Sequence, residues 1–308
     1  MAGKRAFTPV FDGLCPAMTG TKMAIVYDKL MALDIEPAEQ AYDAKDCMLY
    51  ALGVGLGHDP MNEDELAFVY EKDLKVLPTM ATVIGHGGSL VRHPDSGINW
   101  LMVVNGEQGF TLNRPLKGQD VVVGYTRIVE VIDKGAGKGA LLLTERDIVA
   151  QGSGELIGVV TQTVFCRGDG GFGGPPRKAP EPHPIPARAP DATCDLGTRP
   201  EMALIYRLSG DYNPLHAEPA FAKAAGFPRP ILHGLGTFGV SGHALLKTMC
   251  GYDPARLVSF GCRFSAPVYP GETIRTEMWR DGDVVSFRAR VLDRDVIAIN
   301  NGRAEVRP

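Results

Sequence analysis

The stretch Gly234-Leu-Gly-Thr-Phe-Gly-Val-Ser-Gly-His-Ala-Leu-Leu-Lys247 decides the fold of this 308-residue chain. Its apolar residues are compatible with a helix, yet glycines recur inside it at positions 236, 239 and 242. A glycine costs about 1 kcal/mol in a helix interior relative to alanine, so these glycines indicate tight packing rather than helix propensity. We expect a buried helix that a β-sheet approaches closely.

Strand-like sequence follows this helix, rich in valine, isoleucine and threonine and bounded by turn residues. These stretches are 257–264, 272–280, 284–291 and 296–304. The same order occurs earlier in the chain. There 38–56 and 79–84 are compatible with helices, and 119–133, 139–150 and 156–167 with strands; 202–208 is a further helix-compatible stretch. The sequence of each half therefore predicts a helix wrapped by an antiparallel sheet, which is an α+β architecture.

Composition changes between residues 167 and 200, where glycines are followed by closely spaced prolines. Proline cannot continue a helix or a central strand, so we expect an extended segment on the surface. The chain is thus predicted to have an N-terminal domain over 1–166, a linker over 167–200 and a C-terminal domain over 201–308.

The two predicted domains share phrases in the same order. Tyr50-Ala-Leu-Gly-Val-Gly55 resembles Tyr206-Arg-Leu-Ser-Gly-Asp211, and Arg114-Pro-Leu-Lys-Gly-Gln119 resembles Ala266-Pro-Val-Tyr-Pro-Gly-Glu272. Coincidence in glycine- and proline-rich sequence is one explanation. We favour an internal duplication, because both phrases recur in the same order.

Charge and hydropathy argue against several classes of protein. Lysine plus arginine (32) nearly balances aspartate plus glutamate (36), whereas a nucleic-acid binder would normally show a basic face. No window approaches about 18 consecutive apolar residues, so no membrane span is expected. The six cysteines form no Cys-x-x-Cys pair and are expected to be reduced. The first residues lack the apolar core of a secretory signal and the last lack a peroxisomal signal, which predicts a cytoplasmic protein.

The segment Ser209-Gly-Asp-Tyr-Asn-Pro-Leu-His216 concentrates polar groups that can carry chemistry. Asp211 and His216 lie on one tight loop and can come within hydrogen-bond reach, so that Asp211 orients the imidazole and sets its tautomer. Histidine is the natural general acid or base near pH 7, and Asn213 adds a neutral donor and acceptor. The alternative is an Asx-turn that carries a surface histidine.

A second polar segment, Pro230-Ile-Leu-His-Gly-Leu-Gly236, leads into the predicted buried helix. Helix N-termini offer unpaired N–H groups and a positive dipole end, so the Gly234 amide could receive a carbonyl oxygen as it gains negative charge. No serine or cysteine nucleophile is then needed. His233 is interpreted as structural, and the other histidines show no metal-ligand spacing, so no metal is predicted.

The phrase Tyr206-x-Leu-Ser-Gly-Asp-x-Asn-Pro-Leu-His216, followed by Ala225-Gly-Phe227 and Pro230-Ile-Leu-His-Gly234, resembles the hydratase 2 motif of the MaoC-like (R)-specific enoyl-CoA hydratases. The resemblance covers nearly the whole chain and extends to the two-domain hydratase 2 unit of peroxisomal multifunctional enzymes. Its further segments are Tyr50–Gly55, Tyr70-Glu71, Leu77-Pro-Thr79, Gly106-Glu-Gln108, Asp133-Lys-Gly135, Gly170–Gly174, Arg263-Phe264 and Pro267–Gly271.

This resemblance implies a double hotdog fold, in which the N-terminal domain is non-catalytic and shapes the acyl pocket. It implies a hydro-lyase of fatty acyl-CoA metabolism and β-oxidation that reversibly hydrates a trans-2-enoyl-CoA to a (3R)-3-hydroxyacyl-CoA. Coenzyme A is part of the substrate and no cofactor is implied. A homodimer is the family expectation.

The resemblance also assigns roles to residues. Asp211 and His216 hold and activate a water, Asn213 helps to position them, and the Gly234 amide binds the thioester oxygen. Glu71 matches an acidic residue that supports activity; the alternative is an exposed carboxylate.

Acyl-CoA contacts are implied at Asn105, Gly106, Lys134 and Phe264. Lys134 suits a polyanionic ligand, although it could simply be a solvated hairpin lysine. Asn105 departs from the family, which usually has a histidine there, and asparagine does not titrate near pH 7. The consequence for substrate binding, like the acyl-chain preference, stays open.

Other functions remain as alternatives. One is a related MaoC-like dehydratase for a branched or dicarboxylic acyl-CoA. Another is a hotdog thioesterase, although those enzymes do not usually carry the Asp-x-Asn-Pro-x-His loop. A non-catalytic acyl-CoA binder is the last, and the intact Asp211/His216 pair argues against it.

Overall fold

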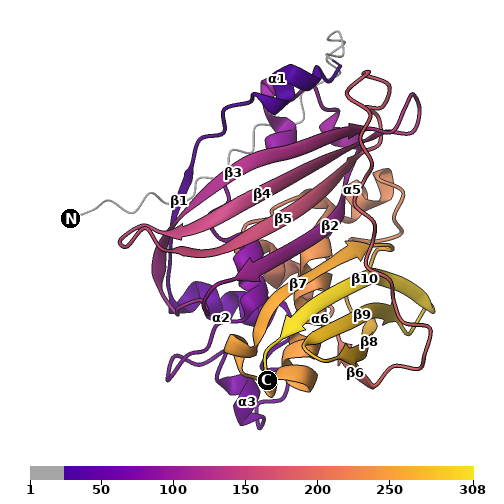
Figure 1. Cartoon of the computed structure of the whole chain (residues 1–308). Helices are drawn as coiled ribbons and strands as arrows, with labels where there is room; N and C mark the ends of the chain where they lie inside the picture. Colours follow the sequence, from indigo (N-terminus) through magenta and orange to yellow (C-terminus); the bar gives the residue numbers. More distant parts are fainter. Residues whose placement is uncertain (1–23) are drawn as a thin grey trace.

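The computed structural model describes residues 24–308, and its main feature is one continuous sheet that runs through both halves of the chain (Figure 1). The sheet is 10-stranded, with the order β1-β3-β4-β5-β2-β7-β10-β9-β8-β6. Neighbouring strands pair antiparallel throughout this order. The α+β class predicted from the sequence is confirmed.

The strands of the first half are β1 (Ala38–Tyr42), β2 (Val103–Leu112), β3 (Asp120–Asp133), β4 (Ala140–Ala150) and β5 (Leu156–Cys166). Those of the second half are β6 (Ala192–Gly197), β7 (Leu257–Phe264), β8 (Thr273–Asp281), β9 (Val284–Val291) and β10 (Val296–Val306). Alternate residues of β4 are buried, as expected of an antiparallel sheet with one face on the core. The predicted strands are found within a residue or two of their expected bounds, at 119–133, 139–150, 156–167, 257–264, 272–280, 284–291 and 296–304.

The strand order is the same when read from either end of the sheet. Beginning at β1, the strands β1, β3, β4, β5 and β2 correspond one to one with β6, β8, β9, β10 and β7 beginning at the other edge. The halves join where β2 pairs with β7, with Gly109 opposite Gly261 and Phe110 opposite Phe260. Such symmetry supports an internal duplication over chance likeness.

The longest helix, α6 (Gly234–Cys250), is the buried helix expected from the sequence. Gly239 and Gly242 admit the first half of the chain rather than the sheet, whereas Gly236 faces Leu232 and Tyr206 of the second half. A Cβ on Gly239 would lie 2.4 Å from Cγ1 of Val54, and one on Gly242 would lie 2.3 Å from Cγ2 of Thr79. The expectation of close packing is thus met, but by a different partner.

The first half has no comparable helix at the matching place. There the chain forms η1 (Pro78–Val83), a short 3₁₀ helix, where the sequence predicts a helix over 79–84. The predicted helix over 38–56 is wrong at its start: residues 38–42 form β1, and α2 (Ala44–Gly53) begins only after Asp43. Asp43 caps α2, because its carboxylate accepts from the backbone N–H groups of Lys45 and Asp46.

The remaining helices are short. They are α1 (Tyr27–Met31), α3 (Glu63–Leu66), η2 (Leu90–Arg92), η3 (Pro94–Ser96), η4 (Trp100–Met102), α4 (Met202–Tyr206), η5 (Arg207–Ser209), η6 (Pro214–His216), α5 (Pro219–Ala224) and η7 (Pro254–Arg256). Within residues 24–308 no helix has both the length and the hydropathy to cross a membrane.

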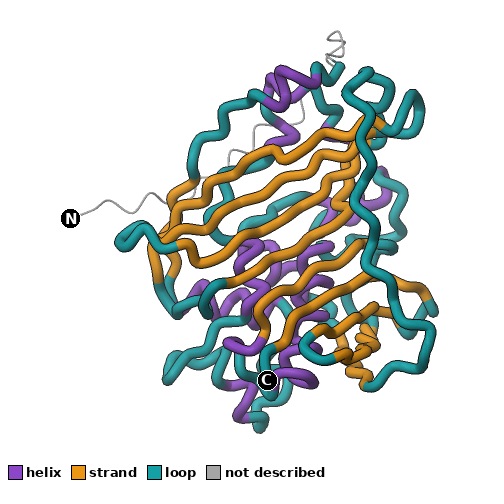
Figure 2. The backbone as a smooth tube through the Cα atoms, viewed as in Figure 1, coloured by secondary structure: helices purple, strands orange, loops and turns teal. Residues whose placement is uncertain are grey.

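The glycine- and proline-rich segment over 167–200 runs as an extended loop past one side of the sheet (Figure 2). It is tied to the second half: Trp279 Nε1 donates to the Arg188 carbonyl at 2.7 Å, and Asn301 Nδ2 donates to the His183 carbonyl at 2.9 Å. Its last part forms β6, which pairs with β8. The expected linker therefore contains an edge strand that its composition did not predict.

A buried carboxylate connects the two halves behind the sheet. Glu65 is only 4% exposed and accepts hydrogen bonds from the Gly57 N–H at 3.0 Å and from the Tyr252 hydroxyl at 3.2 Å. His243 Nε2 lies 3.8 Å from the same carboxylate, and burial lowers the pKa of His243 to about 4. Glu65 is thus held by neutral donors from both halves.

We expect Glu65→Ala to lower the free energy of unfolding by about 3 kcal/mol, because buried donors lose their acceptor. Urea unfolding followed by circular dichroism measures the change. Glu63→Ala is the matched control, since Glu63 is exposed on the same helix. Equal effects of the two substitutions would contradict a role for the buried carboxylate.

Candidate active site

The loop between η5 and η6 is shaped by a series of short-range contacts. Gly210 has φ +120, a conformation that side chains disfavour. The Asp211 carboxylate accepts from the Asn213 N–H, and the Asn213 side chain accepts from the Leu215 N–H, both at 3.1 Å. The Asx-turn considered above is therefore present. His216, at the end of this turn, is not on the surface, however, because it is only 7% exposed.

The tautomer of His216 is set by a backbone carbonyl and not, as we expected, by Asp211. Nδ1 lies 2.9 Å from the Ile231 oxygen. A carbonyl oxygen can only accept, so Nδ1 carries the proton and Nε2 has a free lone pair. Burial lowers the pKa of His216, while the Ile231 bond and the Asp211 charge oppose this shift. His216 is thus a neutral base near pH 7.

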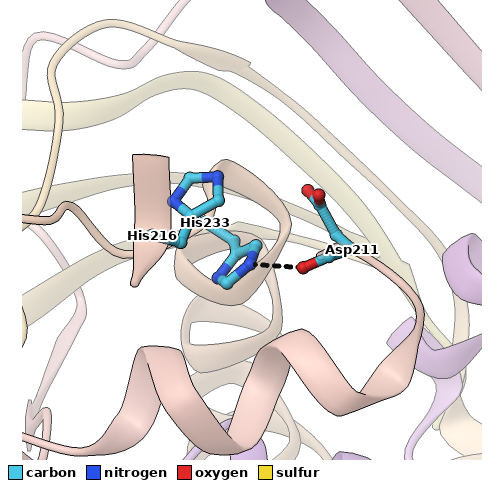
Figure 3. A group of neighbouring side chains, drawn as sticks. All are labelled: Asp211, His216 and His233. Atoms are coloured by element: carbon cyan, nitrogen blue, oxygen red, sulfur yellow. Dashed lines mark hydrogen bonds between the residues drawn. The ribbon is translucent and has the colours of Figure 1, made fainter. Parts of the chain in front are cut away.

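Asp211 faces His216 at a distance suited to a bridging water. The nitrogen and oxygen atoms that Asp211, His216 and His233 can offer to a ligand all lie within 4.8 Å of one another (Figure 3). Two hydrogen bonds of about 2.8 Å through one water span such a gap. The Asp211 side chain is exposed, so the loop leaves it open to an incoming molecule.

Gly234 begins α6 beside this pair. His233, the N-cap residue, makes no side-chain hydrogen bond to the first turn, which leaves the helix end without a capping acceptor. A Cβ on Gly234 would lie 3.6 Å from Cε1 of Phe264. The predicted oxyanion donor and one predicted substrate contact are therefore neighbours.

The other predicted acyl-CoA contacts lie where several neighbouring strands begin or end, on one side of the sheet. Cross-strand pairs place the start of β2, the end of β5 and the β3–β4 turn in one row. Because β7 runs antiparallel to β2, its last residue, Phe264, lies beside the start of β2 in the same row. Asn105 is exposed and accepts from Gln162 Nε2 at 2.9 Å. Gly106 forms a bulge in the β2–β5 ladder. The Lys134 ammonium lies 5.1 Å from the Phe165 ring centre, so this lysine is exposed but not free of contacts.

Glu71 is not brought into this group by any contact of the described residues. It lies in an exposed turn between α3 and η1. Among the residues that the structure describes, no hydrogen bond or ion pair joins Glu71 to the Asp211 loop. Its predicted supporting role stays a prediction.

His233 is the site residue that sequence reasoning underrated. Its ring centre lies 3.7 Å from that of His216, with an angle of 27° between the ring planes, and its Nε2 donates to the Asp211 carbonyl at 3.1 Å (Figure 3). The only signal in the sequence is its place directly before Gly234. The fold thus gathers a carboxylate and two imidazoles, but nearly parallel rings do not aim their in-plane lone pairs at one tetrahedral ion. That no metal is bound stays a prediction.

Comparisons with known proteins show the family to which the chain belongs. The MFE-2 hydratase 2 N-terminal domain matches residues 40–168, and the MaoC like domain matches residues 181–301. The chain is 39% identical to the peroxisomal enoyl-CoA hydratase 2 of Arabidopsis thaliana over 87% of its own length and 91% of that protein. The chain belongs to the enoyl-CoA hydratase 2 family. It is also 35% identical to peroxisomal multifunctional enzyme type 2 of Mus musculus, of which it spans 40%.

Solved structures of other proteins share the fold. A MaoC-like dehydratase from Phytophthora capsici superposes with a TM-score of 0.80 at 35% identity, covering 91% of this chain and 98% of that one. A conserved protein from Mycobacterium tuberculosis described as a double hotdog gives a TM-score of 0.52 at 13% identity, covering 92% of this chain and 98% of the other. The predicted double hotdog is confirmed.

Proposed function

We propose that this hydratase 2 chain catalyses the reversible, (R)-specific hydration of trans-2-enoyl-CoA to (3R)-3-hydroxyacyl-CoA. The observation that carries the proposal is a buried, neutral His216 with a free Nε2, whose ring places a nitrogen within 4.8 Å of the Asp211 carboxylate, a gap that one water can bridge. Family membership supports the same reaction, since the Arabidopsis thaliana relative is named an enoyl-CoA hydratase 2.

In the proposed mechanism Asp211 and His216 hold one water between them. As its oxygen attacks C3 of the alkene, the pair takes up one proton and delivers a proton to C2 on the same face. The elements of water are added, with no net change at the enzyme. The thioester oxygen gains negative charge in this step, and the Gly234 N–H at the start of α6 stabilises it.

Asn213 acts through the loop in this scheme, since its side chain caps η6 and fixes the backbone between Asp211 and His216. Phe264, next to Gly234, would contact the reacting end of the thioester, and Asn105, Gly106 and Lys134 the more distant parts of the coenzyme A. The acyl chain would lie against the first half of the chain, where Tyr50–Gly55 has no counterpart of Asp211 or His216.

The deciding experiment mixes the purified protein with crotonyl-CoA and with a longer enoyl-CoA. Loss of enone absorbance without free thiol means hydration, and free thiol means a thioesterase. Coupling the product to an R- or an S-specific dehydrogenase then tests the stereochemistry, and an S product would overturn the assignment. A chain that hydrates only branched or dicarboxylic enoyl-CoAs would support the related dehydratase.

The reaction should need no cofactor, because imidazole, carboxylate and backbone N–H supply all the chemistry that the mechanism uses. Activity is therefore expected to survive overnight dialysis against EDTA unchanged. Activity that is lost on dialysis and regained with a divalent ion would contradict this expectation.

Activity should fall as the pH falls through the lowered pKa of His216. Nε2 accepts a proton only while the imidazole is neutral, and burial keeps its pKa below the usual 6.5. We expect kcat/KM to reach half of its plateau value at a pH below 6.5 and to decline further as the pH falls. Initial rates between about pH 5 and 8 test this, with circular dichroism at each pH as the control. A half-maximal rate above the usual histidine pKa would contradict it.

Assembly and location are further proposals. A homodimer follows from the family, and light scattering during size-exclusion chromatography measures it. For the location we propose the cytoplasm; fluorescence microscopy with organelle markers discriminates it from the peroxisome, which appears in the names of several relatives.

A further inference from the structure

We propose that His233 is a positioning residue, which holds Asp211 and His216 in register through a hydrogen bond to one and a ring stack on the other. This proposal rests on the hydration proposed above. Under this proposal His233 affects the rate of the reaction and does more than precede α6 in the chain, although its side chain need not touch the substrate.

The hydrogen bond acts on Asp211. The Asp211 side chain is exposed and follows a glycine of unusual φ, so the direction of its carboxylate depends on how its backbone is held. The His233 Nε2–H bond to the Asp211 carbonyl, 3.1 Å long, ties this backbone to the residue directly before Gly234. The catalytic carboxylate and the oxyanion donor thereby share one anchor.

The ring stack acts on His216. The two imidazoles lie 3.7 Å apart, centre to centre, and the Tyr206 ring lies 4.9 Å from the His233 ring. Tyr206 is itself fully buried and lies 5.9 Å from the Tyr50 ring of the first half. This row of packed rings supports one face of the His216 imidazole, and the hydrogen bond from His216 Nδ1 to the Ile231 carbonyl fixes one edge of the same ring. Neither rotation nor tilt of the base is then free.

An imidazole that only filled space would be a poor choice here. His233 is 1% exposed, and its Nδ1 has no hydrogen-bond partner among the described residues. Burying an unpaired acceptor is costly, whereas an apolar ring of similar size would avoid that cost. The group that an apolar ring lacks is the Nε2–H donor to Asp211.

His233 should also be neutral throughout the reaction. Burial, reinforced by the neighbouring His216, lowers its pKa to about 3. The titratable and charged groups that face it are Asp211, His216 and Arg207. A neutral ring lets His216 take up a proton without a second cation stacked against it.

Two substitutions separate the two contacts. His233→Phe keeps a flat ring for the stack but removes the donor, whereas His233→Gln keeps an N–H near the position of Nε2 but removes the ring. We expect His233→Phe to lower kcat about 100-fold, the order of loss for a misplacement of about 1 Å. KM should change little, because the residue does not contact the substrate. His233→Gln should recover most of that loss. His243→Gln is the matched control, because His243 is also a buried histidine but lies inside α6, more than two turns after His233.

A crystal structure of His233→Phe adds a readout that does not depend on turnover, so the proposal can fail separately from the proposed reaction. A displaced Asp211 loop supports the proposal whatever the substrate is. An unmoved loop overturns it, and so does wild-type kcat in His233→Phe. A purely structural role would instead lower the melting temperatures of both variants in parallel, without rescue of kcat by glutamine.

Discussion

Asp211→Asn and His216→Ala should each lower the kcat of hydration by about 10²- to 10⁴-fold while the fold stays intact, since general acid–base groups contribute that much. Asparagine has the shape of aspartate but cannot take a proton from water, and alanine removes Nε2 altogether. The two residues hold one water between them, so the double variant should be little worse than either single variant.

The measurement is the initial rate of enone loss from crotonyl-CoA, with circular dichroism and melting temperature for each variant. Exposed residues of the same types serve as matched controls: Asp283→Asn in the β8–β9 turn and His58→Ala after α2. A catalytic variant that keeps near wild-type turnover with an unchanged spectrum would remove its residue from the mechanism.

Cutting the chain in the linker should abolish activity in both pieces, although the predicted catalytic loop lies wholly in the second. The core is shared: Phe110 of β2 contacts Phe238 of α6 and Phe260 of β7, with ring centres 6.2 and 6.1 Å apart. The cut would also expose the unpaired edges of β2 and β7. Apolar patches and open edges of this kind favour aggregation.

The test expresses residues 1–180 and 181–308 apart and then together. We expect insoluble or aggregated pieces when they are apart, and soluble protein with measurable hydration when they are expressed together. A soluble, monomeric and active 181–308 would show that the first half is dispensable.

Much of the fold was predictable because its signals are local. The long strands β3, β4 and β5 are rich in valine, isoleucine, leucine and threonine and are bounded by glycines, which is a local signal of a strand. The strands β2 and β6 were missed for the opposite reason. Residues 105–109 in β2 are glycine and polar residues, and β6 follows a run of prolines. Their extended state comes from the strands that they pair with, β5, β7 and β8.

The sequence by itself determined the catalytic loop, because Asp211, Asn213 and His216 are held by contacts that span a few residues. It also determined that a glycine-rich helix would be buried. Only the tertiary structure decided which neighbours complete these features. The Ile231 carbonyl selects the His216 tautomer, and His233 stacks on the base. Val54 and Thr79 fill the space left by two glycines of α6, at positions 239 and 242. Ile231 and His233 follow His216 only after another helix and a loop, and Val54 and Thr79 belong to the other half of the chain. These partners meet only in the folded core, so no local pattern encodes them.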